Sequence, residues 1–135
     1  MKKFILIILI AVSLFSVSCT DEVGGNADMS TVNFSVQSSE WRENGTIGDS
    51  DYGFYVDLNF PELTNNVIQN GMVTLYMKAG ESWVSVPFNY FYSSFQGGYF
   101  YSMKVGTFSI DYYESDHQTV NPGTQIFRLV IVQPK

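Results

Sequence analysis

The feature that most constrains this chain is an alternation of apolar and polar side chains that recurs along most of its length. Val32, Phe34 and Val36 alternate with polar residues, and the same pattern returns at 54–60 and at 107–112. A period of two is the period of a β-strand, whose successive side chains point to opposite faces. Each segment is therefore expected to present one buried face and one wetter face, as strands of antiparallel sheets do.

Further strands and frequent turns extend this pattern to the C-terminus. The segments 72–77 and 126–132 are more continuously apolar, which predicts strands covered on both faces. Arg128, the one charge in the second segment, is expected to lie near a sheet edge or to meet a carboxylate. Segments 83–91 and 99–105 bring the total to about seven or eight strands, with turn residues between them. Short strands separated by turns predict an all-β fold, an antiparallel, immunoglobulin-like β-sandwich.

One segment departs from the strand period. Pro61-Glu62-Leu63 begins it, Val67 follows Leu63 after one helical turn, and Asn70-Gly71 ends it. Proline in the first turn and glycine just past the end are typical of helix boundaries. The sequence therefore predicts a short crossover helix near 62–70. Gly71 is expected to cap it with a positive φ angle.

The first nineteen residues have the organisation of a secretory signal. Lys2 and Lys3 precede nine residues without a polar side chain, and small residues lead to Cys19, the only cysteine. The apolar stretch is shorter than the roughly 20 residues that span a bilayer. Val17-Ser18-Cys19 resembles a lipobox, although Ser16 stands where leucine is usual. We therefore expect residues 1–18 to be removed and Cys19 to be acylated, so that its partner is the lipid bilayer.

The expected mature chain consists of a flexible tether at 19–30 and one β-sandwich domain at 31–135. Loss of Lys2 and Lys3 leaves five basic residues against thirteen acidic ones, a formal charge of −8. A nucleic-acid-binding protein needs a basic footprint, which this composition lacks. Electrostatic adsorption to anionic lipid is disfavoured for the same reason. Membrane attachment is thus expected to come from the acyl chains.

The chain also resembles a class of small Bacteroidota lipoproteins, most of them without a known activity. The resemblance lies in the acidic residues of Thr20-Asp21-Glu22 directly after the cysteine, and in the strand patterns at 71–77, 83–87 and 127–134. It implies a lipid anchor in the outer membrane, at the cell surface or alternatively on the periplasmic face. It supports the predicted fold and implies no activity.

The residue types that carry catalysis are sparse, so no enzyme activity is expected. There is no Gly-x-Ser-x-Gly motif, and His117, the only histidine, falls in a loop where a solvated side chain is expected. Two groups of carboxylates could supply a glycosidase pair, Asp49 with Asp51, and Asp111, Glu114 and Asp116. Both groups lie in or beside polar loops, without the sequence sign of a deep pocket. Asp49 and Asp51 are a weak candidate for calcium, because the remaining ligands of a calcium loop are missing. We therefore expect no metal and no cofactor.

Aromatic residues are densest between Phe88 and Tyr101. The runs 90–92 and 99–101 each place rings on both faces of a strand, within a hairpin predicted to turn at 96–98. Phenylalanine has no hydroxyl that needs a partner, so the phenylalanines are expected inside and the tyrosines outside. The candidate ligand-binding residues are then Tyr90, Tyr92, Tyr99 and Tyr101. The alternative is that cross-strand aromatic pairs only stabilise the sheet.

Together these features predict a membrane-anchored lipoprotein that acts as a binding or structural module for a glycan or a protein. One alternative is a carbohydrate-binding accessory of a glycan-uptake system, which needs an exposed aromatic row beside polar groups. Another is an adhesin or assembly subunit, which needs an unpaired edge strand.

Overall fold

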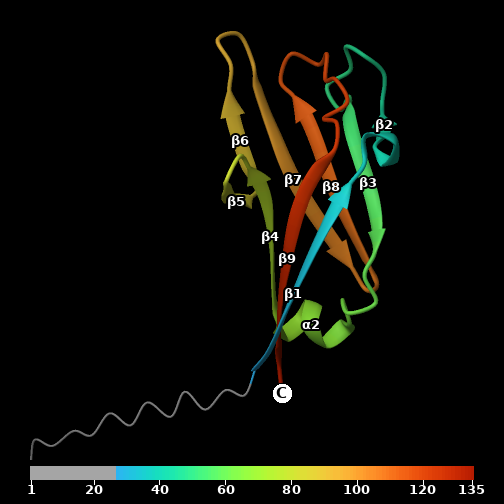
Figure 1. Cartoon of the computed structure of the whole chain (residues 1–135). Helices are drawn as coiled ribbons and strands as arrows, with labels where there is room; N and C mark the ends of the chain where they lie inside the picture. The colour runs from blue at the N-terminus through green and yellow to red at the C-terminus, as the bar shows by residue number, and fades with distance from the viewer. Residues whose placement is uncertain (1–26) are drawn as a thin grey trace, which may run out of the picture.

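A computed structural model describes residues 27–135 as two antiparallel sheets packed face to face (Figure 1). The four-stranded sheet contains, in order, β1 (Ala27–Val36), β9 (Gln125–Pro134), β4 (Met72–Ala79) and β5 (Ser82–Val86). The five-stranded sheet contains β2 (Arg42–Asn44), β3 (Gly53–Asn59), β8 (Thr107–Glu114), β7 (Gln96–Lys104) and β6 (Phe88–Phe91). The predicted all-β sandwich is therefore confirmed.

The strands differ from the predicted segments in three places. The short strand β2 was not predicted, and the segment 83–91 is divided into β5 and β6 at Pro87, whose nitrogen has no hydrogen for a sheet hydrogen bond. β1 begins at Ala27, within the segment 19–30 that the sequence suggested as a tether. Residues 1–26, and with them the signal peptide and Cys19, lie outside the described residues.

The order of the strands places the first and last strands side by side. β1 pairs with β9 over its whole length, from Ala27 opposite Pro134 to Val36 opposite Gln125. In immunoglobulin domains the first two strands are neighbours, so this sandwich shares their architecture and differs in strand order. The pairing of β9 with β4 on its other edge places the C-terminal strand in the interior of the sheet.

The core lies between the two sheets and follows the predicted alternation. Phe108 and Ile110 on β8, Leu75 on β4, and Phe127 and Leu129 on β9 are fully buried. The ring of Phe127 lies 5.7 Å from that of Phe34 on its own sheet and 6.2 Å from that of Tyr99 on the facing sheet. Aromatic contacts thus link the two sheets across the interior.

Two predictions for the four-stranded sheet were wrong. β4 and β9 are buried on one face only, since Met72 and Ile126 are exposed on the other. Arg128 lies on an interior strand rather than an edge, and it contacts Trp83 and Asn33 rather than a carboxylate. In this sheet, a continuous run of apolar residues therefore forms strands that are buried on one face and only partly covered on the other.

The single α-helix of the described part, α2 (Asn65–Asn70), starts later than predicted. Thr64 caps it, because its Oγ1 accepts a hydrogen bond from the Val67 amide at 3.3 Å, whereas Pro61 and Glu62 form a preceding turn. α2 lies at the lower end of the sandwich, near the C-terminus (Figure 1). No helix among residues 27–135 is both long and apolar enough to cross a membrane.

Gly71 ends α2 in a way that the sequence did not indicate. Its φ of −94° and ψ of −171° are extended, so the predicted positive φ was wrong. A Cβ at this position would come within 2.5 Å of the Val132 carbonyl oxygen and 2.7 Å of the Val67 carbonyl oxygen. Glycine is needed here because the helix end lies directly against the backbone of β9.

Candidate functional site

The outer face of the five-stranded sheet carries a pair of stacked aromatic rings. Phe100 on β7 and Tyr113 on β8 lie 4.8 Å apart between ring centroids, with planes inclined by 6°. Their chain neighbours Tyr99 and Tyr112 are each only 4% exposed and point into the core. Alternation along both strands therefore turns Phe100 and Tyr113 outward, and Tyr113 remains 46% exposed.

A glycine leaves room for this pair. Gly98 lies opposite Tyr113 in the register of β7 with β8 and opposite Asn89 in the register of β6 with β7. A Cβ on Gly98 would come within 2.8 Å of the Phe100 ring and still closer to the Asn89 side chain. The missing side chain leaves the space above Gly98 to the edge of the Phe100 ring.

Polar side chains surround the stacked rings. Asn44 on β2 donates a hydrogen bond from Nδ2 to the backbone oxygen of Asp51 at 3.1 Å, which ties the loop after β2 to the sheet edge. Asp111 on β8 lies opposite Phe100. Burial raises the pKa of the Asp111 carboxyl, and the negative charge of Asp57 raises it further. The Asp57 carboxylate accepts a hydrogen bond from Ser109 Oγ at 2.5 Å.

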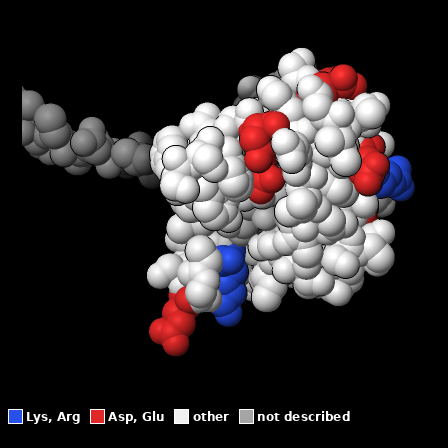
Figure 2. All heavy atoms as spheres, turned by 90° about the horizontal axis from the view of Figure 1, so that it is seen from above, with Lys and Arg blue, Asp and Glu red and all other residues white. Residues whose placement is uncertain are grey.

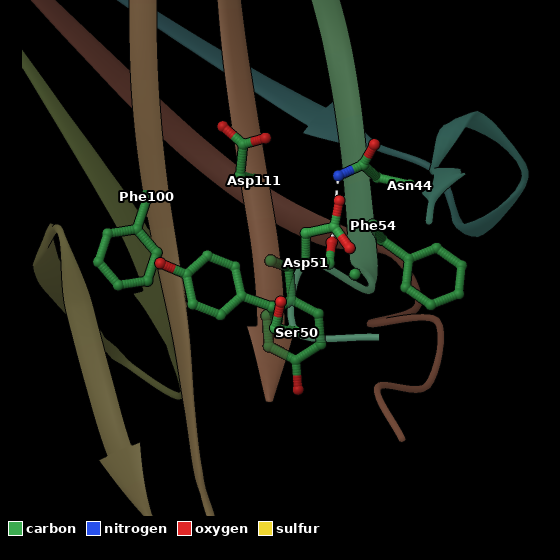
Figure 3. A pocket seen from close by; sticks show the side chains of 9 residues that line it. Asn44, Ser50, Asp51, Phe54, Phe100 and Asp111 are labelled. Carbon is green, nitrogen blue, oxygen red and sulfur yellow. Dashed lines mark hydrogen bonds between the residues drawn. The ribbon is translucent and has the colours of Figure 1, made fainter. Parts of the chain in front are cut away.

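These groups line a pocket with a volume of about 460 Å³, a size typical of small-ligand sites. Figure 3 shows Phe100 on one side of it, with Asn44 and Asp51 on the other side and Asp111 between them. The pocket is lined by Asn44, Ser50, Asp51, Gly53, Phe54, Phe100, Asp111, Tyr112 and Tyr113. A second pocket of about 310 Å³ shares Ser50, Phe100 and Tyr113 with it, so the two adjoin across the stacked rings.

The surface around the loop end of the sandwich carries little charge. Seen from above in Figure 2, most of the surface is neither acidic nor basic, and the acidic side chains form separate patches. The two aspartates of the first pocket are its only charged lining residues. The arrangement offers ring faces, hydroxyls, amides and carboxylates, which suits a polar, uncharged ligand.

The candidate tyrosines lie elsewhere than predicted. The hairpin is formed, but it turns at 92–95, and Gln96 to Gly98 belong to β7. Tyr99 is buried, and Tyr90 and Tyr101 pack against the core from the inner face. Phe91 is 79% exposed. The prediction that phenylalanines are inside and tyrosines outside was therefore wrong for this hairpin.

Hydrogen-bond partners in the interior explain three of the inward tyrosines, Tyr90, Tyr101 and Tyr112. The Tyr101 hydroxyl donates to the Val73 carbonyl oxygen at 3.2 Å, and the Tyr112 hydroxyl donates to the Glu114 carboxylate at 2.6 Å. The Tyr90 hydroxyl in turn bonds to that of Tyr112. Tyr92 is exposed in the turn, where its ring lies 4.4 Å from that of Phe95. Of the four candidates, only Tyr92 is largely exposed to solvent.

The acidic candidates are not grouped as the sequence suggested. Glu114 is buried beside Tyr112, whereas Asp116 turns back to accept a hydrogen bond from the Gln118 amide at 3.1 Å. Asp51 and Asp111, which are distant in sequence, line one pocket. Within residues 27–135, no three histidine, cysteine or acidic side chains converge as metal ligands, and Asp49 and Asp51 form no such group.

His117 lies at the loop end of the sandwich, where it lines the second pocket. Its backbone has a positive φ of 57°. Its carbonyl accepts a hydrogen bond from the Gly48 amide at 2.8 Å, so it ties two loops together through the main chain.

Phe100 and Tyr113 were not singled out from the sequence as a pair. The sequence features that could have indicated this pair were the two glycines at 97–98 and the two tyrosines at 112–113. The described part is thus a β-sandwich with an aromatic pocket on one sheet face. No protein-family model matches this chain, and neither a curated protein nor a solved structure is significantly similar to it.

Proposed function

We propose that this protein is an outer-membrane lipoprotein, anchored through acylated Cys19, whose sandwich binds a glycan on the outer face of the five-stranded sheet. The observation that carries the proposal is the Phe100–Tyr113 stack beside a pocket lined by Asn44, Ser50 and Asp111. Sugar rings present C–H faces that stack on aromatic rings, and hydroxyls that pair with amides and carboxylates. The proposed role is binding without catalysis.

The shape of the sheet face supports a chain ligand. The two pockets adjoin across the stacked rings, one toward the β2 edge of the sheet and one toward β6. A polymer that crosses the strands would contact both pockets and rest on the rings between them. The proposed surface location would give the module access to such polymers outside the cell.

The glycan proposal predicts that Tyr113→Ala weakens binding by roughly tenfold, because the loss of one aromatic contact lowers the affinity by about that factor. Tyr113 is 46% exposed, so its replacement is expected to leave the fold intact. Isothermal titration with a panel of neutral oligosaccharides measures the affinity. Ile126→Ala is the control, because Ile126 is 42% exposed, a fraction close to that of Tyr113, and lies on the other sheet, away from both pockets. Equal affinities for wild type and Tyr113→Ala would contradict the proposed site.

The lipid anchor is tested separately through Cys19. Cys19→Ala is expected to move the protein from the detergent phase to the aqueous phase in a partition assay, because the acyl chains supply the membrane affinity. Processing is expected to fail in the same variant, which gel mobility would reveal. A Cys19→Ala protein that still enters the detergent phase would show that the anchor is a different segment.

A second candidate function, assembly through an edge strand, rests on β1. Its ten residues pair with β9 without interruption, and it forms the edge of the four-stranded sheet. The strand contains no proline or lysine to discourage pairing with another strand. Such an edge could accept a strand from a partner protein.

A further inference from the structure

The outer face of the four-stranded sheet carries an arginine that is held in position from two sides. Arg128 on β9 places its Cζ 4.0 Å from the centre of the Trp83 ring, which belongs to β5. Its Nε donates a hydrogen bond to Asn33 Oδ1, on β1, at 2.9 Å. The cation–π contact and the hydrogen bond together hold the guanidinium in place.

Among residues 27–135, Arg128 has no counter-ion within 4.0 Å. In the stretch 27–135, the one ion pair within 4.0 Å joins Lys135 to Asp28. The two terminal nitrogens of Arg128 make no hydrogen bond to any described residue, since only its Nε has a partner. A guanidinium with both terminal nitrogens free presents a fork of donors that matches a planar oxyanion such as a carboxylate.

Neighbouring strands add further donors on the same face. Tyr76 lies opposite Arg128, and Lys78 lies opposite Trp83, in the registers of β4 with its two neighbours. Leu75 and Met77 alternate with them and are buried, so Tyr76 and Lys78 are on the outer side. The chain carries only seven basic residues, and two of them, Arg128 and Lys78, lie on this face.

We infer that Arg128, Lys78 and Tyr76 form a binding site for the carboxylate of a hexuronate unit in an acidic polysaccharide. The carboxylate would accept two hydrogen bonds from the Arg128 fork, with Lys78 adding positive charge. This site lies on the other sheet from the Phe100–Tyr113 pockets, and the inference does not depend on the function proposed for them.

The strand order favours a sugar over an acidic peptide. β9 and β4 are interior strands that are paired on both sides, so they offer no free backbone to an added peptide strand. Asn33 and Tyr76 lie opposite Arg128 in the strand register, and Ser85 lies opposite Tyr76, so these polar side chains share the outer face. These side chains can form hydrogen bonds with the ring hydroxyls of a sugar. The acidic side chain of a peptide has no such hydroxyls.

The test is a fluorescence titration of the full-length protein in detergent micelles with oligogalacturonate. The chain has two tryptophans, and Trp41 is buried in the core, so a ligand at Arg128 is reported mainly by Trp83. We expect a saturable change with oligogalacturonate and none with a neutral galactose oligomer of the same length. Polyglutamate tests the peptide alternative, and binding of polyglutamate as tight as that of oligogalacturonate would overturn the sugar assignment.

Three variants locate the site. Arg128→Gln is expected to weaken oligogalacturonate binding by roughly tenfold or more, the value of hydrogen bonds to a charged group. Arg128→Lys keeps the charge but loses the fork, and should recover only part of the affinity. Lys104→Gln is the matched control, because it removes an exposed positive charge from the other sheet.

Circular dichroism and thermal melting confirm that each variant is folded before titration. If folded Arg128→Gln binds oligogalacturonate with wild-type affinity, binding is absent from this face. If Lys104→Gln loses as much affinity as Arg128→Gln, binding is only nonspecific charge attraction. Either result overturns the proposal.

Discussion

Gly71→Val is expected to lower the free energy of unfolding by about 3 kcal/mol, the upper part of the range for overpacked sites. The new Cβ would come within 2.5 Å of the Val132 carbonyl oxygen and 2.7 Å of the Val67 carbonyl oxygen. Both contacts are with backbone, which cannot rotate away as a side chain can. Either the end of α2 moves away from β9, or the pairing of β9 near Val132 is distorted.

The measurement is urea unfolding followed by circular dichroism, with thermal melting as a second observable. In a domain of this size, a loss of that magnitude lowers Tm by about 10 °C or more. Gly80→Ala separates steric crowding from backbone strain, since Gly80 has a φ of 60° and no atom within 4 Å of its Cβ position. It should cost about 1–2 kcal/mol. A Gly71→Val protein as stable as wild type would show that the helix end can move freely.

The strands and their buried faces were predictable because they depend on local alternation. Val36, Phe108 and Ile110 all lie in the core as the period of two requires. Gly71 shows the limit of the same approach. Asn70-Gly71 is a common helix-ending pair, but the reason for this glycine is the approach of Val132, which is far away in the chain. A contact of that kind follows from the packing of α2 against β9 and has no local signature.

The orientation of the aromatic hairpin was predicted wrongly for a related reason. Alternation shows that Tyr99 and Phe100 point in opposite directions, but it does not show which of them points inward. The preference for buried phenylalanine assumed that a buried hydroxyl lacks a partner. In the folded chain, the Val73 carbonyl and the Glu114 carboxylate supply those partners for Tyr101 and Tyr112.

The candidate site depends on the register between strands. Phe100 and Tyr113 stack because β7 and β8 pair with Tyr99 opposite Tyr112, which places the two outward rings diagonally. Asp51 and Asp111 meet in one pocket because β3 pairs with β8. The sequence identifies the aromatic and acidic residues. The alternation of apolar and polar residues does not show which strands pair or in which register.

The second large effect is expected at alkaline pH, because three tyrosines between the sheets resist ionisation. Burial raises the pKa of Tyr90 from its ordinary value of 10.0 to about 12. Burial also raises the pKa of Tyr99. The pKa of Tyr112 is raised first by burial and then by the hydrogen bond to Glu114, which needs the hydroxyl proton.

The sign of the pH dependence follows from proton binding. Below pH 10 these tyrosines are protonated in both the folded and the unfolded protein, so their contribution to stability is complete. Above pH 10 the unfolded chain loses these protons while the folded protein keeps them. The free energy of unfolding then falls by about 1.4 kcal/mol per pH unit for each such tyrosine. For Tyr90 the loss continues until its folded pKa of about 12 is reached.

Urea unfolding between pH 8 and pH 12 measures this dependence. We expect little change from these residues up to pH 10 and a steep fall in the urea midpoint above it. Tyr99→Phe keeps the buried ring and removes one hydroxyl, so the decline above pH 10 should become shallower by about 1.4 kcal/mol per pH unit. Absorbance at alkaline pH gives an independent check, since Tyr90 should ionise near pH 12 in the folded protein. A urea midpoint that stays constant from pH 10 to pH 12 would mean that these hydroxyls ionise as readily in the folded protein as in the unfolded chain.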